Sequence, residues 1–422
     1  MSTSTNVVRL RQPDEIDDPL TDVLRAGARR LLAQAVELEA EAFLAGMRDL
    51  KLPDGRARLV RHGHGPEREI QTGIGPVAVS KVRIRDRGAA SDVERVRFSS
   101  SILPKWARRT RSLDALLPIL YLRGVSTGDF QEALAALLGR DAPNLSPSVI
   151  ARLTAEWQAE YERWQRRDLS ARRYVYVWAD GVYLQARMED HAECMLVLIG
   201  ATPEGRKELV GFQTGVRESA QSWRELLVDV KRRGLAIAPE IAVGDGALGF
   251  WKALDELYPG TRHQRCWLHK TGNVLNRVPK TVQPAMKADL REIHAAPTRA
   301  AAEGAISVFV EKHGAKYPRA AECLTKDRDA LLAFYDLPAE HWDHLRTTNP
   351  IESVFATVRH RTVRTKGSLS PTTARLMVFK LVVAASKTWR RLKGENQLPK
   401  VVAGVTFQDG TEVIHSPSSR AA

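Results

Sequence analysis

A chain of 422 residues is longer than one hydrophobic core usually organises, so we expect several folding units. Its 64 basic residues outnumber 50 acidic ones, and the net charge of +14 favours a polyanionic partner, nucleic acid first. Three cysteines, an odd number in so long a chain, exclude a disulfide framework and are typical of a reducing compartment.

The chain carries no signal-peptide pattern, and no apolar run approaches the ~18 residues that a membrane span needs. The best candidate, residues 376–385, is short and interrupted by Lys380. We therefore expect a soluble cytoplasmic protein that joins the nucleoid when it binds DNA.

Three sequence patterns precede the first predicted sheet. Apolar residues between Leu20 and Leu50 recur at helical spacing and predict a helix or a helix pair. Residues 51–98 alternate apolar and basic positions around glycine turns, which is typical of a basic hairpin that either tracks phosphates or merely faces solvent. Residues 105–168 contain three helical patterns with tight turns, which fit either a helix-turn-helix module or a bundle that only packs.

From Tyr174 the pattern changes to strands. Three strands with short turns predict an antiparallel meander, followed by a helix that Ser222 and Glu225 would cap. A strand ending at Asp245, a second helix and an extended segment with Cys266-x-x-His269 complete the order β-β-β-α-β-α-β. This is the order of a ribonuclease H-like mixed α/β sheet, in which a right-handed crossover lays the fourth strand parallel to the first.

The rest of the chain is predicted to be mainly helical. Residues 279–345 form an all-α insertion. A helix then begins with Asn349 as N-cap and Pro350 at its first position, and a last long helix runs from Ser370 to about Lys393. An Asp-Gly turn in the tail predicts a small hairpin.

Three carboxylates are expected at one edge of the sheet. Asp180 follows the first strand, Asp245 follows the fourth, and Glu352 lies on the helix after the insertion. Each also has a structural explanation, as a turn residue, a helix N-cap and a capping box with Asn349, respectively. Together, three hard oxygen donors suit two Mg²⁺ ions ~3.5–4 Å apart, with Mn²⁺ as a substitute, which is the arrangement used for phosphodiester chemistry.

Other candidate residues surround this trio. Cys266 and His269, with His263 as a third candidate, are too few for a structural zinc site, so we expect the pair to support the active-site pocket, with zinc left open. Arg359 shares a helix face with Glu352 and either holds a scissile phosphate or belongs to a solvated basic face. The further DNA-binding candidates are Arg361, Arg364 and Lys366.

The segments DGVYLQAR, GDGALGFWKAL, QRCWLHKTGNVL and TTNPIESVFATVRHRT resemble the Mutator-type bacterial insertion-sequence transposases, and the resemblance extends over about residues 20–413. It implies a DDE transposase that cleaves DNA at terminal inverted repeats and joins the 3′ ends to a target. Asp180, Asp245 and Glu352 match the catalytic, metal-binding acids. The implied partners are double-stranded DNA, both repeats and target, and a second copy of the chain, because an element has two ends.

Two alternatives stay open. One is a ribonuclease H-like nuclease or resolvase that cuts without joining, and the other is a transposase-derived DNA-binding regulator without catalysis.

The predicted organisation is an N-terminal tail and helical segment at 1–50, a basic β-ribbon region at 51–104, helix-turn-helix-like DNA-binding helices at 105–170, the catalytic core at 171–278 and 346–394, the all-α insertion at 279–345, and a C-terminal tail at 395–422.

Overall fold

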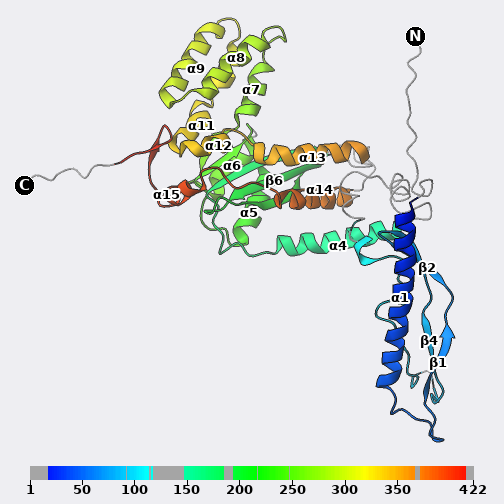
Figure 1. Cartoon of the computed structure of the whole chain (residues 1–422). Coiled ribbons are helices and arrows are strands. Elements are labelled where there is room, and N and C mark those ends of the chain that lie inside the picture. The colour runs from blue at the N-terminus through cyan, green and yellow to red at the C-terminus, as the bar shows by residue number, and fades with distance from the viewer. Residues whose placement is uncertain are drawn as a thin grey trace, which may run out of the picture. The chain divides into compact units, whose positions relative to one another are not determined.

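The computed structural model describes residues 18–91, 93–113, 116, 147–184, 193–215, 217–246, 248–365 and 371–414 (Figure 1). The chain divides into two compact units, Met1–Leu153 and Thr154–Ala422, and each is described by itself. Most of the predicted helix-turn-helix lies outside the described residues. Its third predicted helix corresponds to α4 (Pro147–Gln165).

The described part of the first unit begins with a long helix, α1 (Pro19–Gly46). The Asp18 side chain caps it by accepting a hydrogen bond from the Thr21 N–H, and Pro19 occupies the first position. The segment is therefore a single helix rather than a pair. One face packs Val36 and Ala40 against Ile70 and other apolar side chains of the strands.

The strands of the first unit form two ribbons instead of the single hairpin expected at 51–98. β1 (Leu59–His64) pairs antiparallel with β4 (Val82–Asp86), and β2 (Arg68–Thr72) pairs antiparallel with β3 (Gly75–Val79). The chain reverses between β2 and β3, and the flanking strands β1 and β4 then pair with each other as a second ribbon.

A mixed five-stranded sheet organises the second unit, in the order β7-β6-β5-β8-β9. The first three strands form an antiparallel meander, whereas β8 runs parallel to β5 and β9 parallel to β8. The predicted order β-β-β-α-β-α-β is confirmed. The elements are β5 (Tyr176–Leu184), β6 (Glu193–Ala201), β7 (Lys207–Gly215), α5 (Ala220–Arg232), β8 (Ile241–Gly244), α6 (Leu248–Leu257) and β9 (Arg262–Arg265).

Helices α5 and α6 cover one face of this sheet with the apolar side chains that their periodicity predicted. Trp223 and Leu226 of α5 and Phe250 and Leu254 of α6 join one core cluster with the strands. The predicted cap of α5 is wrong, because the helix begins at Ala220 and Ser219 accepts the capping hydrogen bond from the Ser222 N–H.

Helices continue from the end of β9 to residue 345. The elements are α7 (Trp267–Leu275), α8 (Gln283–Ala295), α9 (Arg299–His313), α10 (Pro318–Thr325), α11 (Arg328–Leu332), the short helices η2 (Ala333–Asp336) and η3 (Ala339–His341), and α12 (Trp342–Leu345). The extended segment expected around Cys266-x-x-His269 is wrong beyond Arg265. The Cys266 N–H still bonds to Gly244 in the sheet, but the Trp267 N–H bonds to the Arg346 carbonyl, and a helix starts there.

Helices α13 (Asn349–Thr365) and α14 (Pro371–Ser386) pack against each other and against the strands (Figure 1). α14 ends before the predicted Lys393, because the following chain turns back and the Leu392 N–H bonds to the Gly205 carbonyl beside the β6–β7 turn. The predicted Asp-Gly hairpin is confirmed after η4 (Glu395–Gln397) and α15 (Leu398–Val402), as β10 (Phe407–Gln408) and β11 (Thr411–Glu412).

Among the helices of the described chain, none combines the length and the apolar character needed to cross a membrane.

Close packing of α6 on the chain before α5 depends on Gly249. A Cβ added there would lie 2.5 Å from the Glu218 carbonyl oxygen and 2.6 Å from the Ala220 nitrogen. We expect Gly249→Ala to lower the melting temperature, because a backbone clash of this kind costs ~1–3 kcal/mol and outweighs the ~1 kcal/mol gain in helix propensity. Gly272→Ala in α7 is the control, since nothing lies within 4 Å of its added Cβ and stability should hold or rise. Equal melting temperatures for the two variants would contradict the close-packing argument.

Candidate active site

Parallel pairing of β5 with β8 brings two acidic residues to neighbouring positions. Ala179 of β5 lies opposite Gly244 of β8, and Asp180 and Asp245 are the residues that follow them. Adjacent strands lie ~4.8 Å apart, so both carboxylates start from the same edge of the sheet. Asp180 lies within β5 rather than at its end, because β5 continues to Leu184 beside β6 after its pairing with β8 has stopped.

Asp180 is a buried carboxylate, with an exposed fraction of 7%. It accepts a hydrogen bond of 2.9 Å from the Gly181 N–H. Burial raises the pKa of Asp180 to about 6, the charge of His269 opposes the rise, and Asp245 and Glu352 add to it. The electrostatic coupling of Asp180 to both other acids is what a shared site requires.

Glu352 reaches the same region from the first turn of α13. Its carboxylate accepts a hydrogen bond of 2.9 Å from the Thr348 hydroxyl, and the Thr348 N–H lies 3.4 Å from the Cys266 sulfur. The capping box expected with Asn349 is wrong, because the helix begins at Asn349 itself. Thr348 therefore holds the Glu352 carboxylate on the side where Cys266 lies.

Cys266, His269 and Glu352 form a compact group, with one ligand atom from each lying within 4.8 Å of the others. Asp180 and Asp245 are not members of that group. The third neighbour of Cys266 and His269 is thus Glu352 and not His263, which instead contacts Asp255 at 2.8 Å. Three ligand atoms of mixed character remain one short of a structural zinc site.

His269 is the cationic member of the cluster. Interaction with the Cys266 side chain raises its pKa to about 9, burial opposes the rise, and the charges of Asp245 and Asp180 reinforce it. Its Nδ1 is buried and has no hydrogen-bond partner. An unpartnered polar atom at this depth is the kind of group that a ligand satisfies.

A fourth carboxylate, Glu218, was not predicted. It lies between β7 and α5, and a Cβ added at Gly181 would be 2.7 Å from its Oε1. Burial raises the pKa of Glu218 to about 7, with contributions from Asp180 and Asp245. A glutamate before a helix cap has no distinguishing sequence pattern, so only the turn after β7 reveals its position.

The four carboxylates form an acidic cluster in which Asp180 and Glu218 are coupled electrostatically to the others. Within the part of the chain that the structure describes, none of the four forms an ion pair with a lysine or arginine, but the charge of His269 acts on Asp180 and that of Arg265 on Asp245. Grouped carboxylates are costly to bury, and a hard divalent cation binds such oxygens well. The residues present therefore suit a divalent cation. The members of the acidic cluster are Asp180, Glu218, Asp245 and Glu352.

The predicted basic residues of α13 lie partly outside the described side chains. Arg359 is exposed two turns beyond Glu352. The side chains of Arg361 and Arg364, and all of Lys366, lie outside the described residues. Their roles in binding DNA stay predictions.

Replacing Glu218 by glutamine tests the electrostatic strain in the acidic cluster. The pKa of Glu218 is raised from its ordinary 4.5 to about 7, so the folded protein retains a proton that the unfolded chain loses, and its free energy of unfolding falls as pH rises through this window. Glutamine has no charge to bury. With EDTA present, we expect Glu218→Gln to raise the melting temperature at pH 8 and to leave it unchanged at pH 4.

Glu225→Gln, an exposed position on α5, is the matched control and should show no such gain at pH 8. A Glu218→Gln variant that is destabilised equally at both pH values would mean that the carboxylate is held by hydrogen bonds instead of being strained by burial.

Comparison with known proteins identifies the family of this chain. The family model "Transposase, Mutator family" matches residues 1–391. The chain is 50% identical over 298 residues to the transposase for insertion sequence element IS6120 of Mycolicibacterium smegmatis, covering 71% of this chain and 92% of that protein. It is 52% identical over 287 residues to the transposase for insertion sequence element IST2 of Acidithiobacillus ferrooxidans, covering 66% and 95%.

A more distant relative spans more of the chain. The transposase for insertion sequence element IS1201 of Lactobacillus helveticus is 27% identical over 363 residues, which is 86% of this chain and 94% of the relative. The family match spans the first unit, continues through the second unit to residue 391 and includes all four acidic residues. This chain belongs to the Mutator family of transposases.

Proposed function

We propose that this protein is a DDE transposase that binds the terminal inverted repeats of its insertion sequence, cleaves a DNA strand there and joins the 3′ end to target DNA. Asp180, Asp245 and Glu352 are assigned as the catalytic, metal-binding acids. The observation that carries this assignment is the pairing of β5 with β8, which starts Asp180 and Asp245 side by side, together with the electrostatic coupling of Asp180 to Glu352.

We also assign the second unit to the ribonuclease H-like class. Its support is the antiparallel meander, the parallel fourth and fifth strands, and the element order, all of which match the arrangement expected for that class. In open sheets containing parallel strands, ligands bind beyond the carboxyl ends of the strands, where Asp180 and Asp245 lie.

The chemistry divides between the cations and the protein. Bound Mg²⁺ ions would activate the attacking oxygen and stabilise the leaving oxygen. The protein itself contributes position: Thr348 orients Glu352 through a hydrogen bond, and Cys266 adjoins both Thr348 and His269. We assign Cys266 and His269 a supporting role, in which the protonated imidazole offsets part of the carboxylate charge.

Replacing Asp245 by asparagine tests the catalytic assignment. Asparagine keeps the volume but removes the anionic oxygen that a hard cation prefers. We expect Asp245→Asn to abolish strand cleavage and transfer with Mg²⁺, while binding of a repeat duplex stays nearly intact. Gel-resolved cleavage of labelled repeat oligonucleotides and fluorescence anisotropy provide the two measurements.

The same assay distinguishes the alternatives. Transfer of 3′ ends supports the transposase, cleavage without transfer supports a nuclease or resolvase, and binding without either supports a regulator. Asp255→Asn, outside the acidic cluster, is the control and should retain cleavage. Full cleavage by Asp245→Asn would remove Asp245 from the site.

We further propose that the protein acts as a homodimer through α1. Leu24, Leu31 and Leu38 recur every seven residues and are 48%, 69% and 57% exposed, while Val36 and Ala40 on the opposite side are buried. A helix that is apolar on both sides has one face left for a partner, and a seven-residue repeat suits a second copy of the same helix.

Substitution of this leucine repeat tests the dimer. We expect Leu24→Gln/Leu31→Gln/Leu38→Gln to convert a dimer to a monomer in light scattering, because glutamine preserves helix propensity and removes the apolar face. The control is a triple substitution of exposed apolar residues in the second unit, Val228→Gln/Ile237→Gln/Val308→Gln. A wild-type protein that is monomeric at tens of micromolar would contradict the proposal.

A further inference from the structure

A cavity of about 600 Å³ opens directly beside Asp245 and has the opposite electrostatic character to the acidic cluster. It lies between α7 and the chain that joins α10 to α11, so the sheet and the helical insertion both contribute to it. We call it the basic cavity. Its charged and amide lining residues are Asp245, Arg265, Lys270, Asn273, Asn276, Arg277, Lys326 and Asp327.

The cations of the basic cavity outnumber its carboxylates. Four cationic side chains (Arg265, Lys270, Arg277, Lys326) face two carboxylates (Asp245, Asp327), so the formal charge is 4 − 2 = +2. If the charge of Asp245 is neutralised by a bound cation, the surplus is larger. A concave surface with a net positive charge attracts an anionic ligand.

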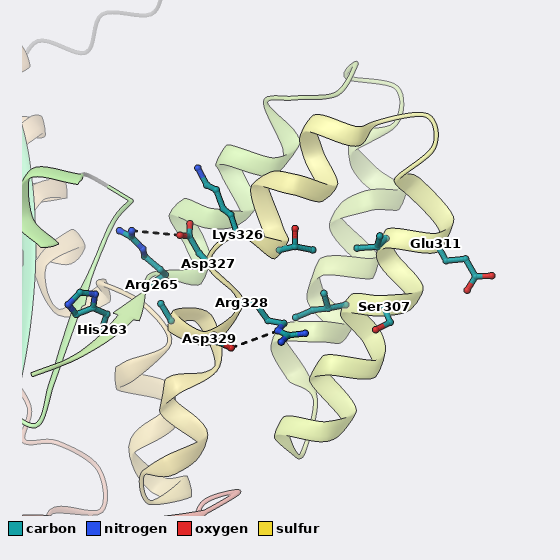
Figure 2. A pocket seen from close by; sticks show the side chains of 12 residues that line it. His263, Arg265, Ser307, Glu311, Lys326, Asp327, Arg328 and Asp329 are labelled. Carbon is teal, nitrogen blue, oxygen red and sulfur yellow. Dashed lines mark ion pairs between the residues drawn. The ribbon is translucent and has the colours of Figure 1, made fainter. Parts of the chain in front are cut away.

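Two of the cations are rigidly held in the wall. Lys270 is 4% exposed, donates a hydrogen bond of 2.9 Å to the Cys323 carbonyl and pairs with Asp327. Arg265 lies 3.8 Å from Asp327 (Figure 2). It also donates a 2.9 Å hydrogen bond to the Asp245 carbonyl. Two buried cations therefore share one carboxylate, and Arg265 links the cavity wall to the backbone of the proposed catalytic loop.

The other polar groups stand at the solvent side. Asn273 lies in the last turn of α7, Asn276 is the C-cap of that helix and Arg277 follows it, and all three are exposed. Lys326 is exposed on the opposite wall and lies beside Asp327 and Arg265 (Figure 2). Arginine, lysine and asparagine side chains are the usual donors to the phosphates of a nucleic-acid backbone.

A neighbouring cavity provides an internal comparison. The cavity of about 710 Å³ in Figure 2 shares Arg265, Lys326 and Asp327 with the basic cavity. Its further charges are Arg328, Glu311 and Asp329, so three cations balance three carboxylates, with His263 counted as neutral. Of these two cavities, only the one that adjoins Asp245 therefore has a positive surplus.

We propose that the basic cavity binds backbone phosphates of the DNA strand next to the scissile phosphate. This inference rests on the proposed function, and it names Arg277 and Lys326 as direct phosphate contacts, with Arg265 and Lys270 as the fixed positive wall behind them. Phosphate contacts of this kind set the register of DNA on a protein without reading its sequence. The insertion thereby takes part in aligning the strand for cleavage.

The test compares two double variants in the Asp245→Asn background, in which DNA is bound but not cut. Arg277→Ala/Lys326→Ala removes the exposed cations of the basic cavity. Lys287→Ala/Arg319→Ala removes one lysine and one arginine that are exposed on α8 and α10 and line neither cavity. The probe is a duplex carrying the terminal repeat and the flanking bases of the element that encodes the protein, measured by anisotropy over a range of salt concentrations.

We call Arg277→Ala/Lys326→Ala the cavity variant and Asp245→Asn alone the parent protein. The cavity variant should bind the duplex more weakly than the parent. The slope of its log affinity against log salt should be smaller by about 2, one for each lost phosphate contact. Single methylphosphonates, which remove one phosphate charge, should weaken binding of the parent protein at one or two positions adjoining the cleavage site. At those positions the same methylphosphonates should weaken DNA binding by the cavity variant little further, because the protein contact is already lost. Equal slopes for the two double variants, or equal methylphosphonate effects in the parent and the cavity variant, would overturn the proposal.

A cleavage assay with the wild-type protein shows whether a failed test concerns the phosphate site or the proposed function. If repeat DNA is cleaved and the two double variants behave alike, the phosphate site is wrong and the transposase stands. If nothing is cleaved but the binding differences appear, the phosphate site stands and the catalytic assignment is wrong.

Discussion

The site depends on one structural constraint, the parallel pairing of β8 with β5 in a sheet whose other half is antiparallel. Parallel pairing requires a crossover connection, which contains α5. The same pairing directs the carboxyl ends of β5 and β8 to one edge of the sheet. Apolar burial maintains this arrangement, because Trp178 and Val243, opposite each other just before the acids, are fully buried. The carboxylates therefore stand at the end of a rigid core that tolerates their mutual repulsion.

The third acid depends on a different set of buried contacts. Before α13 begins, the chain is attached to the sheet by the Trp178 indole, which donates to the His344 carbonyl, and by the Trp267 N–H, which donates to the Arg346 carbonyl. Tyr176 and His341 form a further buried hydrogen bond of 2.7 Å. These bonds place Thr348 next to Cys266, and Thr348 in turn holds Glu352. The long helical segment is thus firmly attached to the rest of the second unit.

Much of this could be predicted from sequence because it depends on local periodicity. Alternation marked the strands and their order, the spacing of Phe250 and Leu254 identified the buried face of α6, and the Asp-Gly pair marked the terminal hairpin. Two of the errors concern features that distant contacts decide. The chain leaves the sheet at Cys266 because of a bond to Arg346, and α14 stops early because Leu392 bonds to Gly205. Glu218 joins the acidic cluster through a turn without a sequence signature.

The acidic cluster and the basic cavity meet at Asp245. Their closeness explains how DNA can approach a group of carboxylates. An acidic cluster repels the polyanion on which a transposase acts, and at physiological salt this repulsion extends ~8 Å. Arg265, bonded to the Asp245 backbone, brings positive charge well within that distance. Cations bound by the carboxylates would remove the repulsion at the scissile phosphate, whereas fixed side chains in the basic cavity would attract the neighbouring phosphates. Under the proposed function, alignment of the strand and chemistry on it are thus assigned to different residues, and a substitution in one set need not disable the other.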